Sequence, residues 1–277
     1  MTTVLRLRTH EVPPALTGMD APRTVVDELV WREVGNTRDG ACRVGRWFLD
    51  TGTDEGFALL WDERDRRGML VPSAGLRAVR AAALTVTAAR LFLYSRVVTV
   101  SVLGSGLAVR VVLAELAAHV PGVSDVAVHA TEVPGDLAED LALAGIGLTV
   151  AASRADAVFG ANLVVLTDPP GDHDWQPARG ALVVNASGQA PPDDVVAQAD
   201  QVFTDDRTRP PGAGPVTADL GQVLTGVHAG RNAPDDIVLV DLPGVDAGGV
   251  WLAYRLYEAA QRQGLGVPAG MPESGGK

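Results

Sequence analysis

The sequence predicts an α/β protein built around a Rossmann-type parallel sheet. Three observations support this prediction. Ala, Val, Leu and Gly dominate the 277 residues, as in proteins with buried parallel strands. Apolar, strand-like runs alternate with helical patterns between Val97 and Asp206. The first of these runs passes through Gly104-Ser105-Gly106 directly into a helical pattern, and a nucleotide-binding βα unit begins in this way.

The segment before this turn, residues 1–95, is expected to hold strands, turns and one helix. Residues 41–49 and 56–61 are predicted to be strands joined by a turn-rich segment. Residues 74–94 are rich in Ala, Leu and Arg with helical spacing, so they predict a helix that leads into the glycine-turn strand.

The alternating region predicts a parallel sheet with its ligand loops at one edge. After the glycine turn, strands are expected over 125–131, 148–152, 163–167, 181–187 and 201–204, with helices over 134–144 and 155–160. Later elements are a short helix over 219–224, a strand over 237–241 and a helix over 250–263, before a Gly/Pro/Ser-rich tail expected to be disordered. Ligands of such sheets bind beyond the carboxyl ends of the strands. The candidate ligand loops are therefore 104–108, 130–132, 167–170 and 186–189.

Composition excludes several functions. A formal net charge of −11 argues against nucleic acid and anionic membranes as partners. No apolar run reaches the roughly 20 residues of a membrane span, and the charged first residues do not suit a signal peptide, so a cytoplasmic protein is expected. The single Cys42 excludes an intrachain disulfide, and no metal site is predicted. Lysine occurs only at Lys277, a bias that suggests a GC-rich bacterial genome.

Several segments, in order and spacing, resemble the ornithine cyclodeaminase/μ-crystallin family. They are residues 76–83, 104–109, 219–224 with Gly230-Arg231, and 237–246 leading into 254–258. The resemblance implies a divergent, N-terminally shortened member with a Rossmann dinucleotide-binding domain (96–232). This domain would be inserted in a discontinuous α+β substrate/dimerisation domain (1–95 and 233–267), followed by a tail (268–277). It also implies a homodimer that binds NAD or NADP and interconverts amines and imines.

The resemblance places the cofactor on residues of the glycine turn and of the following loops. Gly104, Ser105, Gly106, Leu107 and Ala108 form the phosphate turn, although the third glycine position falls on Val109 or Ala108. Further candidates are Thr131, Glu132, Thr167, Asp168 and Ser187, which follow later strands. An acidic residue near the end of the second strand suits a ribose hydroxyl, and no arginine there suits a 2′-phosphate. NAD is therefore favoured over NADP.

The resemblance also predicts an arginine clamp for a substrate carboxylate. Arg80 stands at the family's arginine in the pattern L-x-x-x-R-x-A-A, and Arg43 lies where the family generally has a lysine. Arg23 is a third candidate. Guanidinium groups bind carboxylates well, so these residues favour a small-molecule substrate with a carboxylate. The alternative for each is an ordinary solvated arginine.

The catalytic side departs from the family pattern. Gln189 or Ala190 takes the place of the family's acid/base aspartate, and Leu242 takes the place of a hydroxyl residue. The acidic pair that usually follows has become Gly248 and Gly249. Because glutamine and leucine cannot shuttle a proton, ornithine cyclodeamination itself is not expected.

His173, between two aspartates, is the candidate proton donor in place of the missing aspartate. The alternative is a solvated turn. The hypothesis for function is an NAD(P)-dependent oxidoreductase acting on an imine or amino-acid-type substrate in a bacterial biosynthetic pathway. The alternatives are a catalytically degenerate nucleotide- or ligand-binding homodimer with a partner role, and a scaffold that binds no cofactor.

Overall fold

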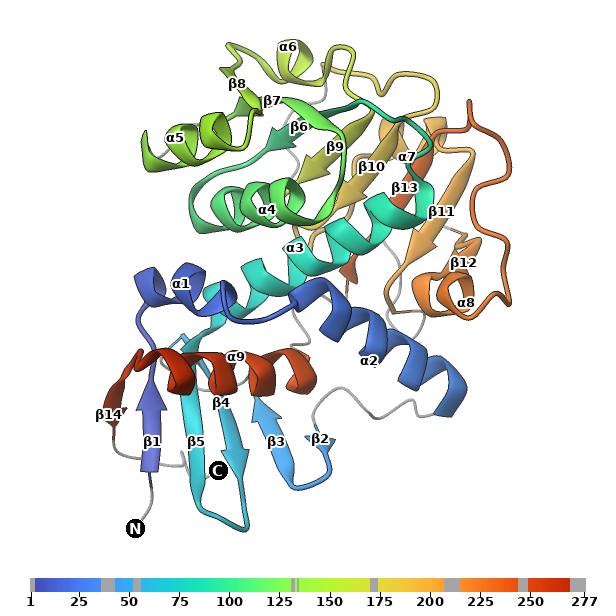
Figure 1. The fold of residues 1–277 in the computed structure, drawn as a ribbon. Coiled ribbons are helices and arrows are strands. Elements are labelled where there is room, and N and C mark those ends of the chain that lie inside the picture. The colour runs from blue at the N-terminus through green and yellow to red at the C-terminus, as the bar shows by residue number, and fades with distance from the viewer. Residues whose placement is uncertain are drawn as a thin grey trace.

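The protein is described as a computed structural model over residues 3–35, 43–51, 56–130, 133, 135–169, 174–206, 215–243 and 249–269. In this part of the chain two sheets lie one above the other, joined by a long helix (Figure 1). None of the helices formed by these residues is both long and apolar enough to cross a bilayer.

The upper sheet, sheet B, contains eight strands in the described part of the chain, and they pair in parallel. Its order is β12-β11-β13-β10-β9-β6-β7-β8, so the direction of strand addition reverses between β6 and β9. The strands are β6 (Val98–Leu103), β7 (Val123–His129), β8 (Gly147–Val150), β9 (Leu163–Leu166), β10 (Leu182–Asn185), β11 (Gln201–Thr204), β12 (Ala218–Asp219) and β13 (Val238–Asp241).

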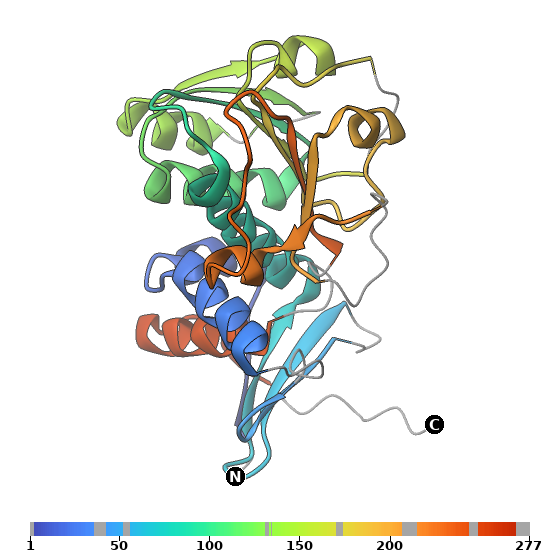
Figure 2. The ribbon, with the colours of Figure 1, turned by 90° about the vertical axis from the view of Figure 1, so that its right-hand side faces the viewer.

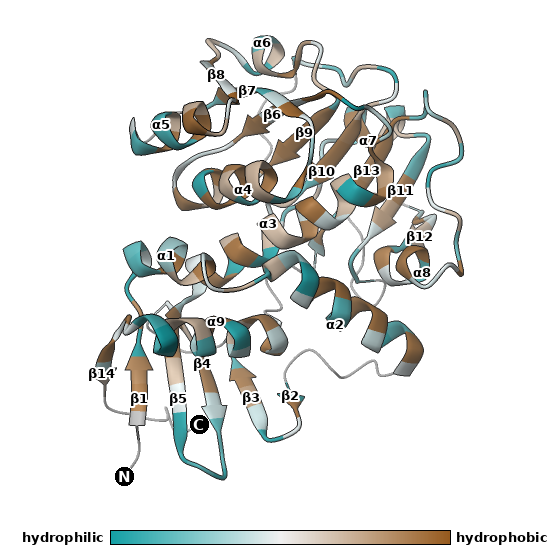
Figure 3. Ribbon diagram, in the orientation of Figure 1, coloured by the Kyte–Doolittle hydropathy of each residue, from teal (hydrophilic) through white to brown (hydrophobic). Residues whose placement is uncertain are grey.

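Sheet B is buried on both faces because its central strands are apolar at most positions on both faces. Alternate residues point to opposite faces of a strand. Leu163 and Val165 of β9 pack in the core that contains α4 (Gly106–His119) and α5 (Gly135–Leu143). Val164 and Leu166 pack in a second core with α6 (Arg154–Val158) and α7 (Asp193–Gln198). The hydrophobic colouring of these strands in Figure 3 reflects this two-sided burial.

The lower sheet, sheet A, is mixed and has the order β14-β1-β5-β4-β3-β2. Only the β1–β5 pairing is parallel. Helices α1, α2 and α9 lie on one side of it, as the rotated view shows (Figure 2). The elements are β1 (Thr3–Arg6), a 3-10 turn (Thr9–Glu11), α1 (Val12–Leu16), α2 (Ala21–Gly35), β2 (Arg43–Val44), β3 (Trp47–Asp50), β4 (Phe57–Asp62), β5 (Arg67–Pro72), α9 (Val250–Gln263) and β14 (Val267–Ala269).

Helix α3 (Ser73–Phe92) connects the two sheets and is buried along most of its length. It packs against α2 and α4, and it touches strands of both sheets. Alanine at 81–83, 88 and 89 lets these neighbours approach closely. At its far end, Arg231 donates from Nη1 to the carbonyl oxygen of Phe92 at 2.7 Å, which satisfies one of the free carbonyls of the last turn. The short helix α8 (Leu220–Leu224) also packs against α2 and α3.

The structure corrects some sequence expectations. The first 95 residues contain α1, α2 and α3, not one helix, and strands β1 and β5 were not predicted. Strand β13 lies within sheet B, so the expectation that residues 233–267 belong as a whole with residues 1–95 is wrong for this strand. The expected disordered tail from residue 268 is wrong for Pro268 and Ala269, which pair with β1. These pairings join residues far apart in the chain, so local sequence patterns could not reveal them.

Candidate functional site

The carboxyl ends of the central strands of sheet B form one row of residues. Leu103, Leu166 and Asn185 are register partners on β6, β9 and β10. Asp241 and Thr204 continue the row on β13 and β11. Ligands of open parallel sheets bind beyond this edge, near the point where strand order reverses. The residues that follow this row are therefore the candidate site.

The glycine turn lies at the reversal point, between β6 and α4. A Cβ on Gly104 would lie 1.9 Å from Thr167 Oγ1 and 3.1 Å from the backbone nitrogen of Asp168, so this close approach requires glycine. Gly106 has φ of +65°, a conformation that favours glycine, and the space around its missing Cβ is open to 4 Å. The first turn of α4 contains no acidic residue. Its N–H groups therefore fit an anion such as a pyrophosphate.

A side-chain hydrogen bond joins the turn to the loop after β9. Ser105 Oγ donates to Asp168 Oδ2 at 2.8 Å. Leu107 and Ala108, half-buried, form the first turn of α4. The structure thus brings together the predicted cofactor residues of the turn with Thr167 and Asp168.

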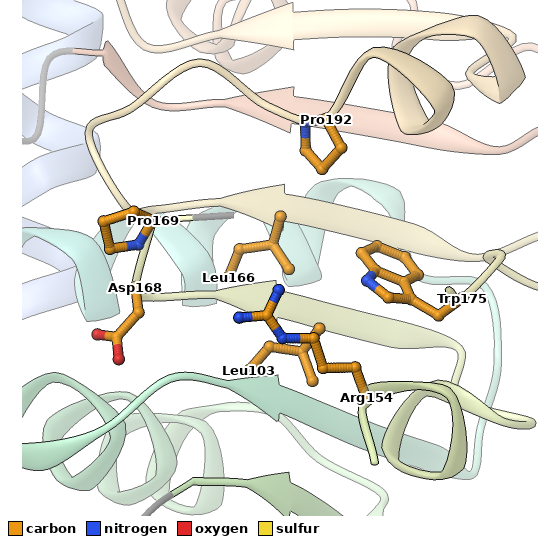
Figure 4. Close-up of a pocket in the computed structure, with 7 residues that line it drawn as sticks. All are labelled: Leu103, Arg154, Leu166, Asp168, Pro169, Trp175 and Pro192. Atoms are coloured by element: carbon orange, nitrogen blue, oxygen red, sulfur yellow. The ribbon is translucent and has the colours of Figure 1, made fainter. Parts of the chain in front are cut away.

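A small pocket lies beside the turn (Figure 4). In this view the guanidinium group of Arg154 extends over Leu103 and Leu166 and lies between Asp168 and Trp175. Arg154 is the first residue of α6. The pocket is lined by Leu103, Arg154, Leu166, Asp168, Pro169, Trp175 and Pro192. The carboxyl edge therefore carries a guanidinium group that the sequence did not single out.

A buried hydrogen-bond network follows on β10 and β13. The Asn185 amide donates from Nδ2 to Asp241 Oδ1 at 2.8 Å and to the carbonyl oxygen of Gln189 at 2.7 Å. Ser187 Oγ donates to Asn185 Oδ1 at 2.7 Å and accepts from the backbone N–H of Gln189 at 3.1 Å. Asn185 and Asp241 are both buried. This network fixes the orientation of the Asp241 carboxylate at the strand ends.

A group of charged residues, called here the Arg80 cluster, is buried where α2 and α3 meet the end of β11. It contains Arg80, Glu28, Asp205, Arg32 and Asp206. Arg80 Nη1 lies 3.1 Å from Glu28 Oε1, and its Nη2 lies 3.7 Å from Asp205 Oδ2. Burial opposes the charge of Arg80, but Glu28 and Asp205 outweigh it and raise the pKa of Arg80. Arg32 joins the cluster at 3.5 Å from Asp206.

The other predicted arginines have different surroundings. Arg43 on the edge strand β2 pairs with Glu63, and both side chains are more than half exposed. Arg23 pairs with Asp27 at 2.9 Å on the surface of α2. Arg43 and Arg80 are thus engaged with different carboxylates. Whether either guanidinium binds substrate stays a prediction.

The structure also shows the surroundings of the residues at positions where the family pattern is lost. The side chain of Gln189 is exposed, and Leu242 is fully buried in the core. Asp193 and Asp194, the nearest aspartates after Gln189 in the chain, are exposed in the first turn of α7. The predicted residues Thr131, Glu132 and His173 lie outside the described residues.

Known proteins resemble this chain in structure but not in recognisable sequence. No protein-family model matches it, and no curated protein matches it significantly. CmnK matches with a TM-score of 0.73 at 24% identity, covering 99% of this chain and 100% of CmnK. An archaeal alanine dehydrogenase dimer with bound NAD matches with a TM-score of 0.71 at 16% identity. The match covers 98% of this chain and 99% of the dehydrogenase. The Thermococcus litoralis Δ1-pyrroline-2-carboxylate reductase, solved with NADH and L-proline, matches with a TM-score of 0.69 at 14% identity. The match covers 95% of this chain and 99% of the reductase.

The other full-length matches include a probable ornithine cyclodeaminase from Bordetella pertussis and a lysine cyclodeaminase. The chain has the ornithine cyclodeaminase/μ-crystallin fold. The predicted fold class is confirmed, since a parallel Rossmann-type sheet is combined with a mixed sheet from both ends of the chain. This fold places the glycine turn, the Asn185 network and the Arg80 cluster along one edge of sheet B.

Sequence reasoning missed several residues of this edge. Asp205 and Asp206 directly follow the predicted strand 201–204, and both are buried. Asn185 and Asp241 end predicted strands, so their place at a carboxyl edge was a usable signal. Glu28 offered no such signal, because only the packing of α2 on α3 brings it to Arg80.

Proposed function

We propose that this protein is an NAD(P)-dependent oxidoreductase that interconverts an amine and an imine at the carboxyl edge of sheet B. One observation carries the proposal: an open glycine turn suited to a pyrophosphate lies on the same strand-end row as a buried, hydrogen-bonded carboxylate, Asp241. Structures with this fold and bound NAD or NADH support the cofactor class.

The dinucleotide would be held by residues of the glycine turn. The close approach at Gly104 and the open space at Gly106 suit a phosphate group against the N-terminus of α4. When bound, the nicotinamide supplies or accepts a hydride. We propose NAD as the preferred dinucleotide, since no arginine stands among residues 130–135, directly after β7. We also propose a homodimer, as in the archaeal alanine dehydrogenase.

Asp241 is the proposed acid/base residue. Interconversion of an amine and an imine requires a proton to move at the nitrogen, and a positioned carboxylate can hold that proton. Asp241 lies three strand spacings from β6, about 14 Å along the edge. This distance separates the phosphate end of the site from its reacting end. His173 stays an alternative proton donor.

A second candidate function is a nucleotide-binding homodimer without turnover. The exposed Gln189 side chain and the buried Leu242 favour it, because neither offers a proton at the site.

Titration of the purified protein with NADH and NADPH, followed by nicotinamide fluorescence, tests the proposal. We expect NADH to bind, and we expect NADH oxidation at 340 nm with one or more members of a panel of cyclic and acyclic imines. Binding without turnover would favour the second candidate. Binding of neither dinucleotide would contradict both.

A further inference from the structure

Arg154 lies on the opposite side of the glycine turn from the proposed reacting end. The strand order places β9, β10 and β13, the strand of Asp241, on one side of β6, and β7 and β8 on the other. Arg154 is the first residue of α6, which follows β8 and packs against β6 and β7. The pyrophosphate of a dinucleotide joins its two halves at the turn. A nicotinamide directed toward Asp241 therefore leaves the adenosine half on the side of β7 and β8.

The start of α6 fixes the place from which Arg154 extends. Ser153 is the N-cap of α6, and its Oγ accepts from the backbone N–H of Asp156 at 3.0 Å. From this point the Arg154 side chain runs across the strand ends, and its guanidinium group lies between Trp175 and Asp168 (Figure 4). Asp168 in turn accepts from Ser105 Oγ of the glycine turn at 2.8 Å. Arg154 therefore reaches the part of the edge at which the turn lies.

The guanidinium group of Arg154 rests on apolar side chains. Leu103 and Leu166 lie beneath it, and the buried rings of Trp175 and Pro192 line the same pocket. The space left in this pocket is about 10 Å³, which is room for a single water molecule. No aromatic ring can enter there. Because Arg154 is only half-buried, a planar ligand group can contact the guanidinium from its accessible side.

We propose that Arg154 binds the adenine base of the dinucleotide by stacking its guanidinium group on the ring. A guanidinium is planar and weakly hydrated, and it is attracted to the face of an aromatic ring. A neutral base fits this place better than a further phosphate, because the carboxylate of Asp168 in the same pocket repels an anion. The inference rests on the proposed function in taking the ligand to be a dinucleotide. It adds the residue that determines the affinity for the adenosine half.

Calorimetric titration of the protein with ADP and with inorganic pyrophosphate tests the inference. ADP carries the base, whereas pyrophosphate offers only the group that fits the glycine turn. The wild-type protein is expected to bind ADP more tightly than pyrophosphate. Arg154→Met is expected to bind ADP about tenfold more weakly than the wild type, with the affinity for pyrophosphate unchanged.

Arg154→Lys separates stacking from charge, because lysine keeps the positive charge but has no planar group. This variant should lose affinity for ADP by a similar factor and should keep its affinity for pyrophosphate. Arg179→Met is the matched control, since Arg179 is exposed and pairs with Asp200 at 3.4 Å, and it should change neither titration. If Arg154→Met fails to fold, Arg154→Lys is compared with the wild type and decides the outcome by the same criterion.

Three results would overturn the inference. The first is a wild-type protein that does not bind ADP, and the second is an unchanged ADP affinity in the folded Arg154 variants. The third is an equal loss of ADP and pyrophosphate binding in Arg154→Met that Arg154→Lys restores, because this pattern shows a charge acting on phosphate.

The assay of NADH oxidation with imines decides the proposed function separately. An ADP affinity that depends on Arg154, in a protein that oxidises no NADH, supports the role of Arg154 and contradicts the proposed oxidoreductase. NADH oxidation together with an ADP affinity that is independent of Arg154 supports the oxidoreductase and overturns this inference.

Discussion

The glycine turn and the Arg80 cluster lie along the same edge of sheet B but are built in opposite ways. The turn is formed by consecutive residues between β6 and α4; Gly104 allows close packing on the loop after β9, and Gly106 leaves open space for an anion. The cluster is formed by α2, α3 and the end of β11, and its buried guanidinium is already paired. The glycine turn is open to a negatively charged ligand, whereas the guanidinium of the Arg80 cluster is already paired with carboxylates of the protein.

This difference separates cofactor binding from substrate choice. A turn that depends on backbone geometry can keep its function while surrounding side chains change. A buried ion pair depends on every partner, because removing one leaves an uncompensated charge. We therefore expect variants of the turn to affect dinucleotide affinity, and variants of the cluster to affect folding.

The largest expected effect concerns the reacting end of the edge. Asp241→Asn can still accept the hydrogen bond from Asn185 but cannot carry a proton. With an imine identified as a substrate, kcat should fall by about 10²–10⁴-fold while the Kd of NADH stays unchanged. Asp194→Asn, an exposed aspartate of α7, is the control. Equal kcat in the wild type and Asp241→Asn would remove Asp241 from the proposed chemistry.

The Arg80 cluster should be sensitive to loss of its central charge. Arg80→Met leaves Glu28 and Asp205 buried without their guanidinium partner, so the free energy of unfolding should fall by about 3–5 kcal/mol. Urea denaturation measures this change. Arg43→Met should lower the free energy of unfolding by less than about 1 kcal/mol, because the Arg43–Glu63 pair is exposed. Equal losses in the free energy of unfolding would show that the buried Arg80 pair stabilises the fold no more than the exposed Arg43–Glu63 pair.

Helix α4, which follows the glycine turn, carries a buried acid of its own. Burial and the nearby Asp20 raise the pKa of Glu115 to about 7, although Arg90 lowers it. His119 Nε2 lies 3.6 Å from Glu115 Oε2. The folded protein therefore binds a proton more tightly than the unfolded chain, and stability should fall as pH rises from about 4.5 to 7.

Glu115→Gln should remove this pH dependence and raise the free energy of unfolding above pH 7 by up to about 3 kcal/mol. Urea denaturation across this pH range measures it, with the exposed Glu139→Gln of α5 as the control. A Glu115→Gln variant with the wild-type pH profile would contradict the prediction.

The smallest effect tests the turn itself. Gly104→Ala places a methyl group 1.9 Å from Thr167 Oγ1 and forces the turn away from the loop after β9. The affinity for NADH, measured by fluorescence, should fall by about tenfold or more. Gly135→Ala, at the start of α5 where a Cβ meets nothing within 4 Å, should leave it unchanged. Unchanged affinity in Gly104→Ala would place the dinucleotide elsewhere.

Much of sheet B could be predicted from the sequence. The strands β9, β10 and β11 and the helices α3, α5 and α9 lie within one or two residues of their predicted bounds, because apolar periodicity is a local property. Strand β1 escaped prediction because both of its partners, β5 and β14, are distant in the chain. Strand β5 was also missed, although it pairs with the preceding strand β4. The glycine turn could also be predicted, because its motif lies within a few consecutive residues.

The rest of the site could not be found in this way. Asn185 and Asp241 are 56 positions apart, and Glu28 and Arg80 are 52 positions apart. A sequence pattern gives the type of each residue but not which distant residue it will meet. Arg80 matched a family arginine, yet its partners became known only when α2 was seen packed against α3.

The sequence by itself determined the fold class, the alternation of strands and helices in sheet B and the position of the glycine turn, because these depend on short-range spacing. Only the tertiary structure decided that β13 lies within sheet B and that Glu28 occupies Arg80. Long-range pairing and the burial of charge depend on the packing of whole elements, and this packing has no local signature.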